Sequence, residues 1–314
     1  MSYKASAPGS LMLLGEYGVL FGLPALVCAV DKRIHVMLRP REDNIINIHS
    51  ALLGDYATDL SVLQIEKPFQ FVLGAVKQLQ SKIRRGFDLH IESEFSDKVG
   101  LGSSAAVTVA TLAAIMTWLD IRISPIDLVR QGRSVIRQCQ GIGSGADVAA
   151  SVYGGVVYYH SQPLTAEKIA VKLPLTLHYT GFKTKTADAI QQVKTRFTHY
   201  PLVFKQLCSG IGQCAADGVQ WVRKQDLAKL GELMNIQQGL MDALGVNLPI
   251  MQHMTSVLRQ QNGVRGVKIS GSGLGDCVVS LGEVASDINF GDHYDGIHPI
   301  PVEMTLHGVQ SEKN

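Results

Sequence analysis

Cysteine is scarce in this sequence, and the few cysteines lie scattered along it. The 314 residues contain five, which are Cys28, Cys139, Cys208, Cys214 and Cys277. Their number is odd, and neither a CxxC pair nor a cluster of cysteine with histidine occurs. Disulfide frameworks and zinc sites use such spacings, so both are disfavoured, and we expect free thiols in a reducing compartment.

Long apolar runs and runs of like charge are also lacking. No stretch reaches the roughly 18 apolar residues of a membrane-spanning helix. The first apolar run has no basic region before it and is interrupted by Gly15 and Glu16. The sequence therefore predicts neither a membrane segment nor a signal peptide, and it favours a cytoplasmic protein. Since 29 basic residues balance 27 acidic ones without a basic run, nucleic acid and anionic membranes are disfavoured as partners, whereas a small anionic substrate is not.

The composition that is present is that of a folded enzyme. Hydrophobic residues make up 46% and charged residues 18%, which excludes intrinsic disorder and allows one large domain or two. The composition changes between Pro163 and Pro174, so we expect a boundary that separates residues 1–168 from residues 169–314.

The spacing of apolar residues predicts the order of strands and helices. Strands are expected at 25–30, 33–40, 44–50, 87–93, 175–181, 266–270 and 277–281, with a further β-rich piece at 299–309. Helices are expected from 68, at 103–118 and at 125–138, and then in a run near 184–196, 201–222, 226–242 and 249–261. Because helices come in runs, the pattern favours an α+β fold over a doubly wound parallel sheet.

The segment VGLGSSAAV, residues 99–107, places two glycines and two serines directly before a long apolar run. A helix that begins there leaves backbone N–H groups without partners and has a partial positive charge at its first turn. Glycine lets the backbone approach a ligand closely, so a phosphate could accept several hydrogen bonds at once. The hydroxyls of Ser103 and Ser104 could reach phosphate oxygens or Mg²⁺. The alternative is a serine-capped helix without a ligand.

Two further glycine-rich segments contain polar residues. In GSGAD, residues 143–147, Asp147 precedes a small apolar stretch. A partly desolvated carboxylate there could take or orient the proton of a substrate hydroxyl during phosphoryl transfer, although it could equally be a cap or a turn residue. ISGSGLGDC, residues 269–277, is typical of a strand, a turn and a second strand. It is either a plain hairpin or the far wall of a nucleotide pocket.

The three segments, in this order, resemble the motifs of the GHMP kinases, a family of ATP-dependent small-molecule kinases. APGSLMLLGEYGVLFGLPAL (residues 7–26) resembles the first motif, VGLGSSAAV the second, GSGADVAASVYGG the region of the catalytic aspartate, and VKISGSGLGDC the third. The resemblance covers nearly the whole chain. It implies a two-domain α+β fold, with an N-terminal ribosomal-S5-like domain and a C-terminal ferredoxin-like domain, and with ATP and Mg²⁺ bound between them.

The resemblance also implies the residues of the site. Asp147 would be the catalytic carboxylate that faces the substrate hydroxyl. The phosphates of ATP would lie against Gly100, Leu101, Gly102, Ser103, Ser104, Ala105, Gly271, Ser272 and Gly273, with Ser104 as a Mg²⁺ ligand. The substrate would lie against Ser10, Glu16, Tyr17, Gly143, Ser144, Gly145, Thr180 and Lys183. Lys268 and Lys183 are candidates for binding anionic groups, with solvated surface lysines as the alternative.

The chain departs from the family pattern at three positions. Ser10 stands where the first motif has lysine, Tyr17 where mevalonate kinases have histidine, and Ile136 where they have a glutamate for Mg²⁺. The pattern is nevertheless most similar to mevalonate kinases, which implies phosphorylation of the terminal hydroxyl of mevalonate in isoprenoid biosynthesis. Phosphomevalonate kinase stays open as the alternative, as does a kinase-fold protein that binds ligand with little or no turnover. A homodimer is compatible with the resemblance.

Overall fold

The structure is a computed structural model that describes residues 1–96, 99–285, 288–291 and 296–314. The strands are β1 (Tyr3–Leu14), β2 (Ala25–Pro40), β3 (Ile45–Ser50), β4 (Gly54–Asp59), β5 (Phe87–Ser93), β6 (Val156–Ser161), β7 (Leu164–Ile169), β8 (Leu175–Tyr179), β9 (Gly266–Ser270), β10 (Cys277–Leu281), β11 (His298–Ile300) and β12 (Gln310–Lys313). The α-helices are α1 (Gln70–Leu79), α2 (Ser103–Trp118), α3 (Pro125–Gln140), α4 (Ala146–Tyr153), α5 (Thr186–Arg196), α6 (Pro201–Lys224), α7 (Leu227–Leu244) and α8 (Pro249–Arg259).

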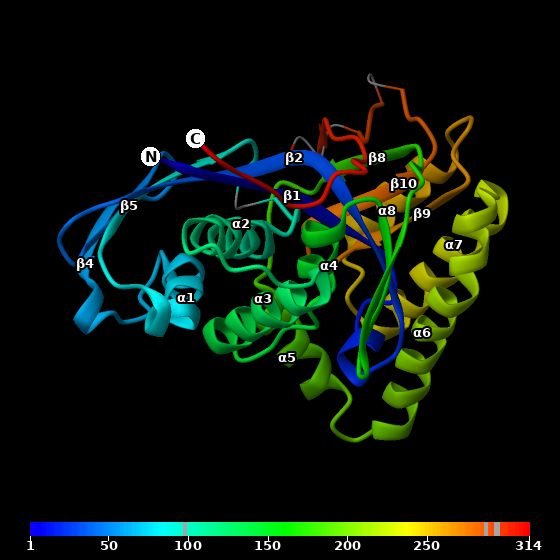
Figure 1. Cartoon of the computed structure of the whole chain (residues 1–314). Helices are drawn as coiled ribbons and strands as arrows, with labels where there is room; N and C mark the ends of the chain where they lie inside the picture. Colours follow the sequence, from blue (N-terminus) through cyan, green and yellow to red (C-terminus); the bar gives the residue numbers. More distant parts are fainter. Residues whose placement is uncertain (97–98, 286–287, 292–295) are drawn as a thin grey trace.

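Two β-sheets form the framework of the molecule (Figure 1). The first sheet has the strand order β12-β1-β2-β5-β3-β4, and β6 joins it by pairing with β2 and β7. The second sheet has the order β11-β8-β10-β9. Among the described strand pairs, β3 and β5 are parallel and the others are antiparallel. The predicted α+β class is confirmed.

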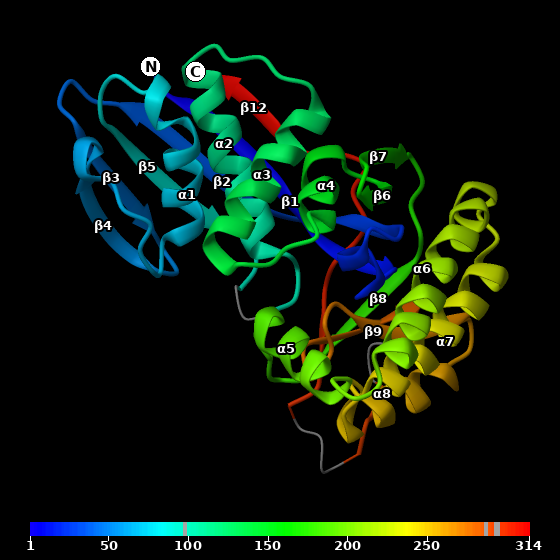
Figure 2. The same ribbon diagram turned by 90° about the horizontal axis from the view of Figure 1, so that it is seen from below.

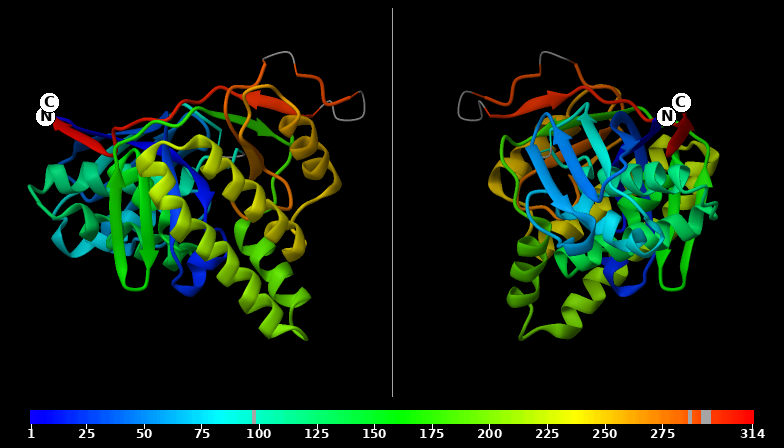
Figure 3. Two further views of the ribbon diagram at one scale, coloured as in Figure 1. Left: turned by 90° about the vertical axis from the view of Figure 1, so that its right-hand side faces the viewer. Right: turned by 60° about the vertical axis from the view of Figure 1, so that its left-hand side comes forward.

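Helices cover the sheets in two separate groups. Helices α1 to α4 lie on one side of the first sheet (Figure 2). Helix α2 packs on β1 and β2, and its small and apolar residues are nearly all buried from Ala105 to Met116. Helix α7 packs on α6 and on β9, while α8 packs on β9 and β10 (Figure 3). No α-helix in the described part of the chain combines the length and apolar character needed to cross a lipid bilayer.

Local sequence signals explain where helices begin and end. Helix α3 starts at Pro125, whose fixed φ suits a first helical position, and the hydroxyl of Ser124 accepts from the N–H of Asp127 at 3.2 Å. Gly141 ends the helix in the left-handed conformation, at φ 73°. Helix α2 differs because Gly102 precedes it and no side chain caps its first turn. The first N–H groups of α2 are therefore left for another partner.

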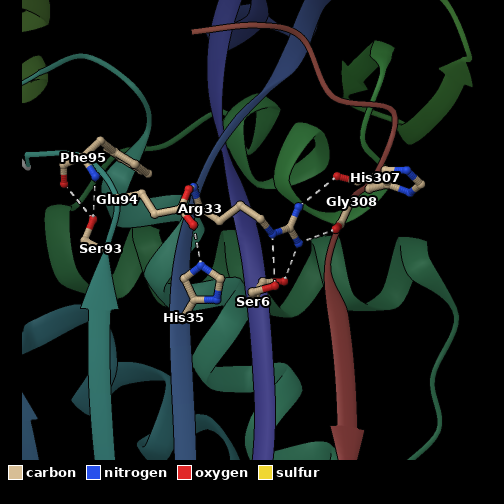
Figure 4. Close-up of polar contacts among 8 residues, drawn as sticks. All are labelled: Ser6, Arg33, His35, Ser93, Glu94, Phe95, His307 and Gly308. Carbon is tan, nitrogen blue, oxygen red and sulfur yellow. Dashed lines mark hydrogen bonds and ion pairs between the residues drawn. The ribbon is translucent and has the colours of Figure 1, made fainter. Parts of the chain in front are cut away.

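The end of the chain returns to the first sheet. Strand β12 pairs with β1, and Arg33 on β2 holds the segment that leads to it (Figure 4). The guanidinium donates to the carbonyl oxygens of Ser6 at 2.9 Å and Gly308 at 2.8 Å, and its Nε donates to the Ser6 hydroxyl at 3.0 Å. Beside it, the Nε2 atom of His35 lies 2.7 Å from the Oε1 atom of Glu94. Strand β1, where the first motif begins, thus pairs with β12 over residues 3–6 on one edge and with β2 along the other.

Strands β4 and β7 were not expected from the sequence, and two expected β-segments differ in extent. Residues 25–30 and 33–40 belong to one strand, β2. The strand continues through Asp31, whose N–H donates to the carbonyl of Glu303. The β-rich piece 299–309 contains the end of β11 and one bridge from Met304 to Val30, because this segment crosses from one sheet to the other. The predicted domain boundary between residues 168 and 169 falls at the end of β7, ahead of β8, and stays a prediction. Strand β12 belongs to the first sheet although it lies at the end of the chain.

Candidate active site

The start of α2 has the geometry of an anion site. Gly102 adopts φ 64°, a left-handed conformation that favours glycine, and no side chain caps the helix. The N–H of Ser10 donates to the carbonyl of Leu101 at 3.0 Å, so the glycine loop lies directly beside β1. A Cβ at Gly102 would lie 2.2 Å from the Ser10 hydroxyl. The open N–H groups and the helix dipole are both suited to a phosphate.

Asp147 lies in the first turn of α4, close to this loop. Gly145, at φ 93°, turns the chain into the helix, and the Ser10 hydroxyl donates to the Asp147 carboxylate at 2.8 Å. Burial raises the pKa of Asp147, whereas the bond from Ser10 and the charge of Lys183 act in the opposite direction. The site thus holds a partly desolvated carboxylate whose basicity is raised, as a proton acceptor requires.

A pocket of about 170 Å³ opens against Asp147. Its polar lining includes Ser104 at the start of α2 and the turn Gly143–Gly145. The rest is largely apolar, and the apolar side chains are Met12, Val19, Leu20, Ile136, Ile142, Val148 and Ile190. Gly271 and Ser272 bring the third motif to the same pocket, so its walls come from both sheets.

Glu16 and Tyr17 bind protein groups while they line this pocket. The Glu16 carboxylate is fully buried, where it pairs with the Lys268 ammonium and accepts from the side-chain amide of Gln237. The Tyr17 hydroxyl donates to the carbonyl of Ser272 at 2.7 Å. These contacts join the first motif to the third across the two sheets. Lys268 is therefore neither a surface lysine nor open to a ligand.

A second carboxylate lies on the other side of the glycine loop. Asp276 belongs to the third motif, and its carboxylate lies close to the backbone N–H of Gly100, which favours the charged form. A Cβ at Gly100 would lie 2.2 Å from the Asp276 carboxylate. The ammonium of Lys183 lies 3.8 Å from the same carboxylate. Burial raises the pKa of Asp276, and Lys183 and the Gly100 N–H oppose that shift.

The structure brings most of the predicted site residues together. The pocket is lined by Glu16, Tyr17, Ser104, Ala105, Gly143, Ser144, Gly145, Asp147, Gly271 and Ser272. Ser10 lies behind Asp147, and Gly102 and Ser103 lie at the start of α2. Leu101 has a fully buried side chain and offers only its backbone.

Three predicted residues face elsewhere, and one of them is Lys183, which faces Asp276. The Thr180 hydroxyl donates to the carbonyl of Phe182 at 2.9 Å, within its own segment, and the side chain is buried. Gly273 packs against Val246. Asp276 was not predicted as a site residue, although the sequence GDC contains it. The apolar lining by Met12 and Ile190 was also not predicted, because these residues are far apart in the sequence and belong to no recognised motif.

The donors near α2 fit Mg²⁺ only in part. Mg²⁺ is usually held by one or two carboxylates together with substrate phosphates and water. The Ser104 hydroxyl lines the pocket and supplies one such oxygen, whereas Ile136 lines it without a donor. Within the described residues, no cluster of three or more histidine, cysteine or acidic side chains could hold a metal ion. A bound Mg²⁺ would therefore depend on phosphate oxygens for much of its coordination.

Comparison with known proteins decides the family. The model for the GHMP kinase N-terminal domain matches residues 70–155, which contain α2 and Asp147, and that for the C-terminal domain matches residues 220–288, which contain the third motif. The chain belongs to the GHMP kinase family. It is an ATP-dependent kinase with an alcohol acceptor, and the predicted two-domain fold is the fold of this family.

Relatives and solved structures agree with this assignment over nearly the whole chain. The mevalonate kinase of Thermococcus sibiricus is 28% identical, with 99% of each chain covered. The Methanococcus jannaschii mevalonate kinase structure has a TM-score of 0.76 at 19% identity, covering 96% of this chain and 98% of its own. The Streptococcus pneumoniae phosphomevalonate kinase, in complex with phosphomevalonate and AMPPNP, has a TM-score of 0.79 at 18% identity, covering 97% and 99%.

Proposed function

We propose that this GHMP kinase transfers the γ-phosphoryl group of ATP to the terminal hydroxyl of mevalonate. The observation that carries the proposal is the position of Asp147, which lines an apolar pocket that Ser104 at the start of α2 also lines. An acceptor in that pocket would meet the carboxylate on one side and the phosphate-binding turn on the other. Relatives named mevalonate kinase, which align over nearly the full chain, support this acceptor.

Different residues of the site would have different roles in the reaction. The N–H groups of Gly102, Ser103 and Ser104 would bind phosphate oxygens at the positive end of α2. Asp147 would accept the proton of the acceptor hydroxyl while Ser10 holds the carboxylate in place. The acceptor oxygen forms a bond to the γ-phosphorus as the bond from that phosphorus to the bridging oxygen of ADP breaks, and the negative charge leaves with ADP. Ser104 would hold Mg²⁺, whose contribution when bound is to neutralise phosphate charge.

The lining of the pocket favours mevalonate over phosphomevalonate. Among the described residues that line it, none is lysine or arginine. Glu16 is paired with Lys268, which leaves Asp147 as the lining carboxylate without a paired cation in the pocket. Apolar side chains suit a branched aliphatic acceptor, while a terminal phosphate of about two negative charges would need cations or several N–H donors there. Phosphomevalonate is accordingly the second acceptor to test, and its use would make the protein a phosphomevalonate kinase. The homodimer stays a prediction.

An acceptor assay with the Asp147→Asn variant tests the proposal. The wild-type protein, supplied with MgATP, should phosphorylate mevalonate and turn over phosphomevalonate poorly. Asp147→Asn should lower kcat by a factor on the order of 10² to 10⁴, the usual contribution of a general base, while its affinity for AMPPNP stays within about threefold, since Asp147 does not hold the phosphates. Preference for phosphomevalonate would reassign the acceptor. Turnover of neither acceptor, or an unchanged kcat in the variant, would contradict the proposal.

A further inference from the structure

Lys183 lies beside Asp276, one of the two carboxylates that flank the glycine loop. Its ammonium is 3.8 Å from the Asp276 carboxylate, and its charge also acts on Asp147. A hydrogen-bonded ion pair is shorter, about 2.7–2.9 Å between nitrogen and oxygen. The Lys183 side chain is 27% exposed, so it is neither locked in place nor fully solvated. Its contact with Asp276 is one that a phosphate oxygen could replace.

The backbone around Lys183 is fixed to the third motif. The N–H of Asp276 donates to the carbonyl of Phe182 at 2.8 Å, and the N–H of Thr180 donates to the carbonyl of Asp276 at 2.9 Å. On the other side of Lys183, the Thr184 hydroxyl donates to the carbonyl of Leu274 at 2.6 Å. The lysine therefore stands on a rigid base, and only its flexible side chain has to move to reach a ligand.

Two other described polar residues of this region do not supply a free cation. Ser10, which contacts the carboxylate, is uncharged. Lys268 is fully buried and its ammonium is paired with Glu16. The γ-phosphoryl group brings negative charge that grows on its oxygens during transfer, and enzymes meet this charge with a positioned lysine, arginine or metal. Lys183 is the described lysine whose charge reaches both Asp147 and the carboxylate beside Gly100.

We propose that Lys183 is the cation that binds the transferred phosphoryl group, and that Asp276 holds it beside the glycine loop until the nucleotide binds. This assignment rests on the proposed kinase function, and it differs from the substrate role expected from the sequence. When ATP enters, the γ-phosphate takes the place of Asp276 as the partner of the ammonium. ADP lacks this phosphate, so Lys183 should distinguish the two nucleotides.

The nucleotide affinities of Lys183→Met test the proposal without catalysis. Titration calorimetry with Mg²⁺ should show AMPPNP binding weakened about tenfold or more, whereas ADP binding changes less than about threefold. Lys183→Arg should keep most of the AMPPNP affinity because it keeps the charge. Lys185→Met is the matched control, since Lys185 is an exposed lysine at the start of α5, two residues away, and it should bind both nucleotides as the wild type does. Equal loss for AMPPNP and ADP, or no loss, would overturn the proposal.

A second variant tests the role of Asp276, and it keeps the proposal testable if Lys183→Met does not fold. Asp276→Asn keeps an oxygen for the Gly100 N–H and removes the competing charge, so AMPPNP should bind more tightly. That gain should disappear in the Lys183→Met, Asp276→Asn double variant. A gain that persists without Lys183, or AMPPNP binding weakened by Asp276→Asn alone, would contradict the proposal. These binding measurements use no acceptor, so a failed acceptor assay would refute the proposed function and leave the assignment of Lys183 to be judged on its own.

Discussion

At the residue scale, the decisive feature is the contact between Ser10 and Asp147. Burial raises the pKa of the carboxylate, and the Ser10 hydroxyl at 2.8 Å lowers it again by binding the charged form. A residue 137 positions away along the chain thus contributes to the proton affinity of Asp147. The sequence identified each of them, but it could not show the contact, because the contact depends on how β1 lies beside α4.

Ser10→Ala should shift the pH dependence of the kinase. Loss of the hydrogen bond raises the pKa of Asp147 further, and the deprotonated carboxylate is the active form. The acid limb of kcat/KM should therefore move to higher pH, and kcat/KM at neutral pH should fall by about tenfold, the cost of one hydrogen bond to a charged group. A pH–rate profile measures both. An acid limb that stays in place, or moves to lower pH, would show that Asp147 is not the group that titrates.

At the element scale, the start of α2 was the most predictable part of the molecule. The sequence predicted both ends of the helix, Ser103 and Trp118, because a glycine-serine turn followed by an uninterrupted apolar run leaves few alternatives. Strands at the edges were less predictable. Strand β12 contains only polar residues, and it is a strand because β1 offers it an open edge about 300 residues away.

Gly102→Ala should disrupt the phosphate-binding turn. Alanine at φ 64° is strained, and its Cβ would displace the Ser10 hydroxyl from a distance of 2.2 Å. AMPPNP affinity should fall by at least about tenfold, as expected for the loss of a hydrogen bond to a charged group. Gly141→Ala is the matched control, since Gly141 also has positive φ, at 73°, but no atom lies within 4 Å of the added Cβ. Comparable affinities in the two variants would contradict the assignment of this turn.

At the scale of the whole molecule, the site exists because two sheets meet. Glu16 comes from the turn after β1, Lys268 from β9 and Gln237 from α7, and all three are buried together. Lys268 could not be placed from the sequence, because its burial depends on a carboxylate 252 positions away. The same network positions Gly271, whose N–H donates to Glu16 at 3.4 Å, beside the pocket.

Lys268→Met should destabilise the fold strongly. Methionine fills the space but leaves the Glu16 carboxylate buried without a cation, which typically costs about 3–5 kcal/mol. Thermal unfolding should show a clearly lower melting temperature. The Glu16→Gln, Lys268→Met double variant removes both charges and should recover much of that loss. A single variant that melts like the wild type, or a double variant that is less stable than the single one, would refute this role of the pair.

The central claim is that the start of α2 binds the nucleotide phosphates while Asp147 meets the acceptor hydroxyl. A crystal structure with AMPPNP, Mg²⁺ and mevalonate measures this most directly. It should show the phosphates on the N–H groups of Ser103 and Ser104, with the terminal hydroxyl of mevalonate about 2.6–3.2 Å from Asp147, the reach of a general base. Phosphates bound away from α2, or a mevalonate hydroxyl with no contact to Asp147, would contradict it.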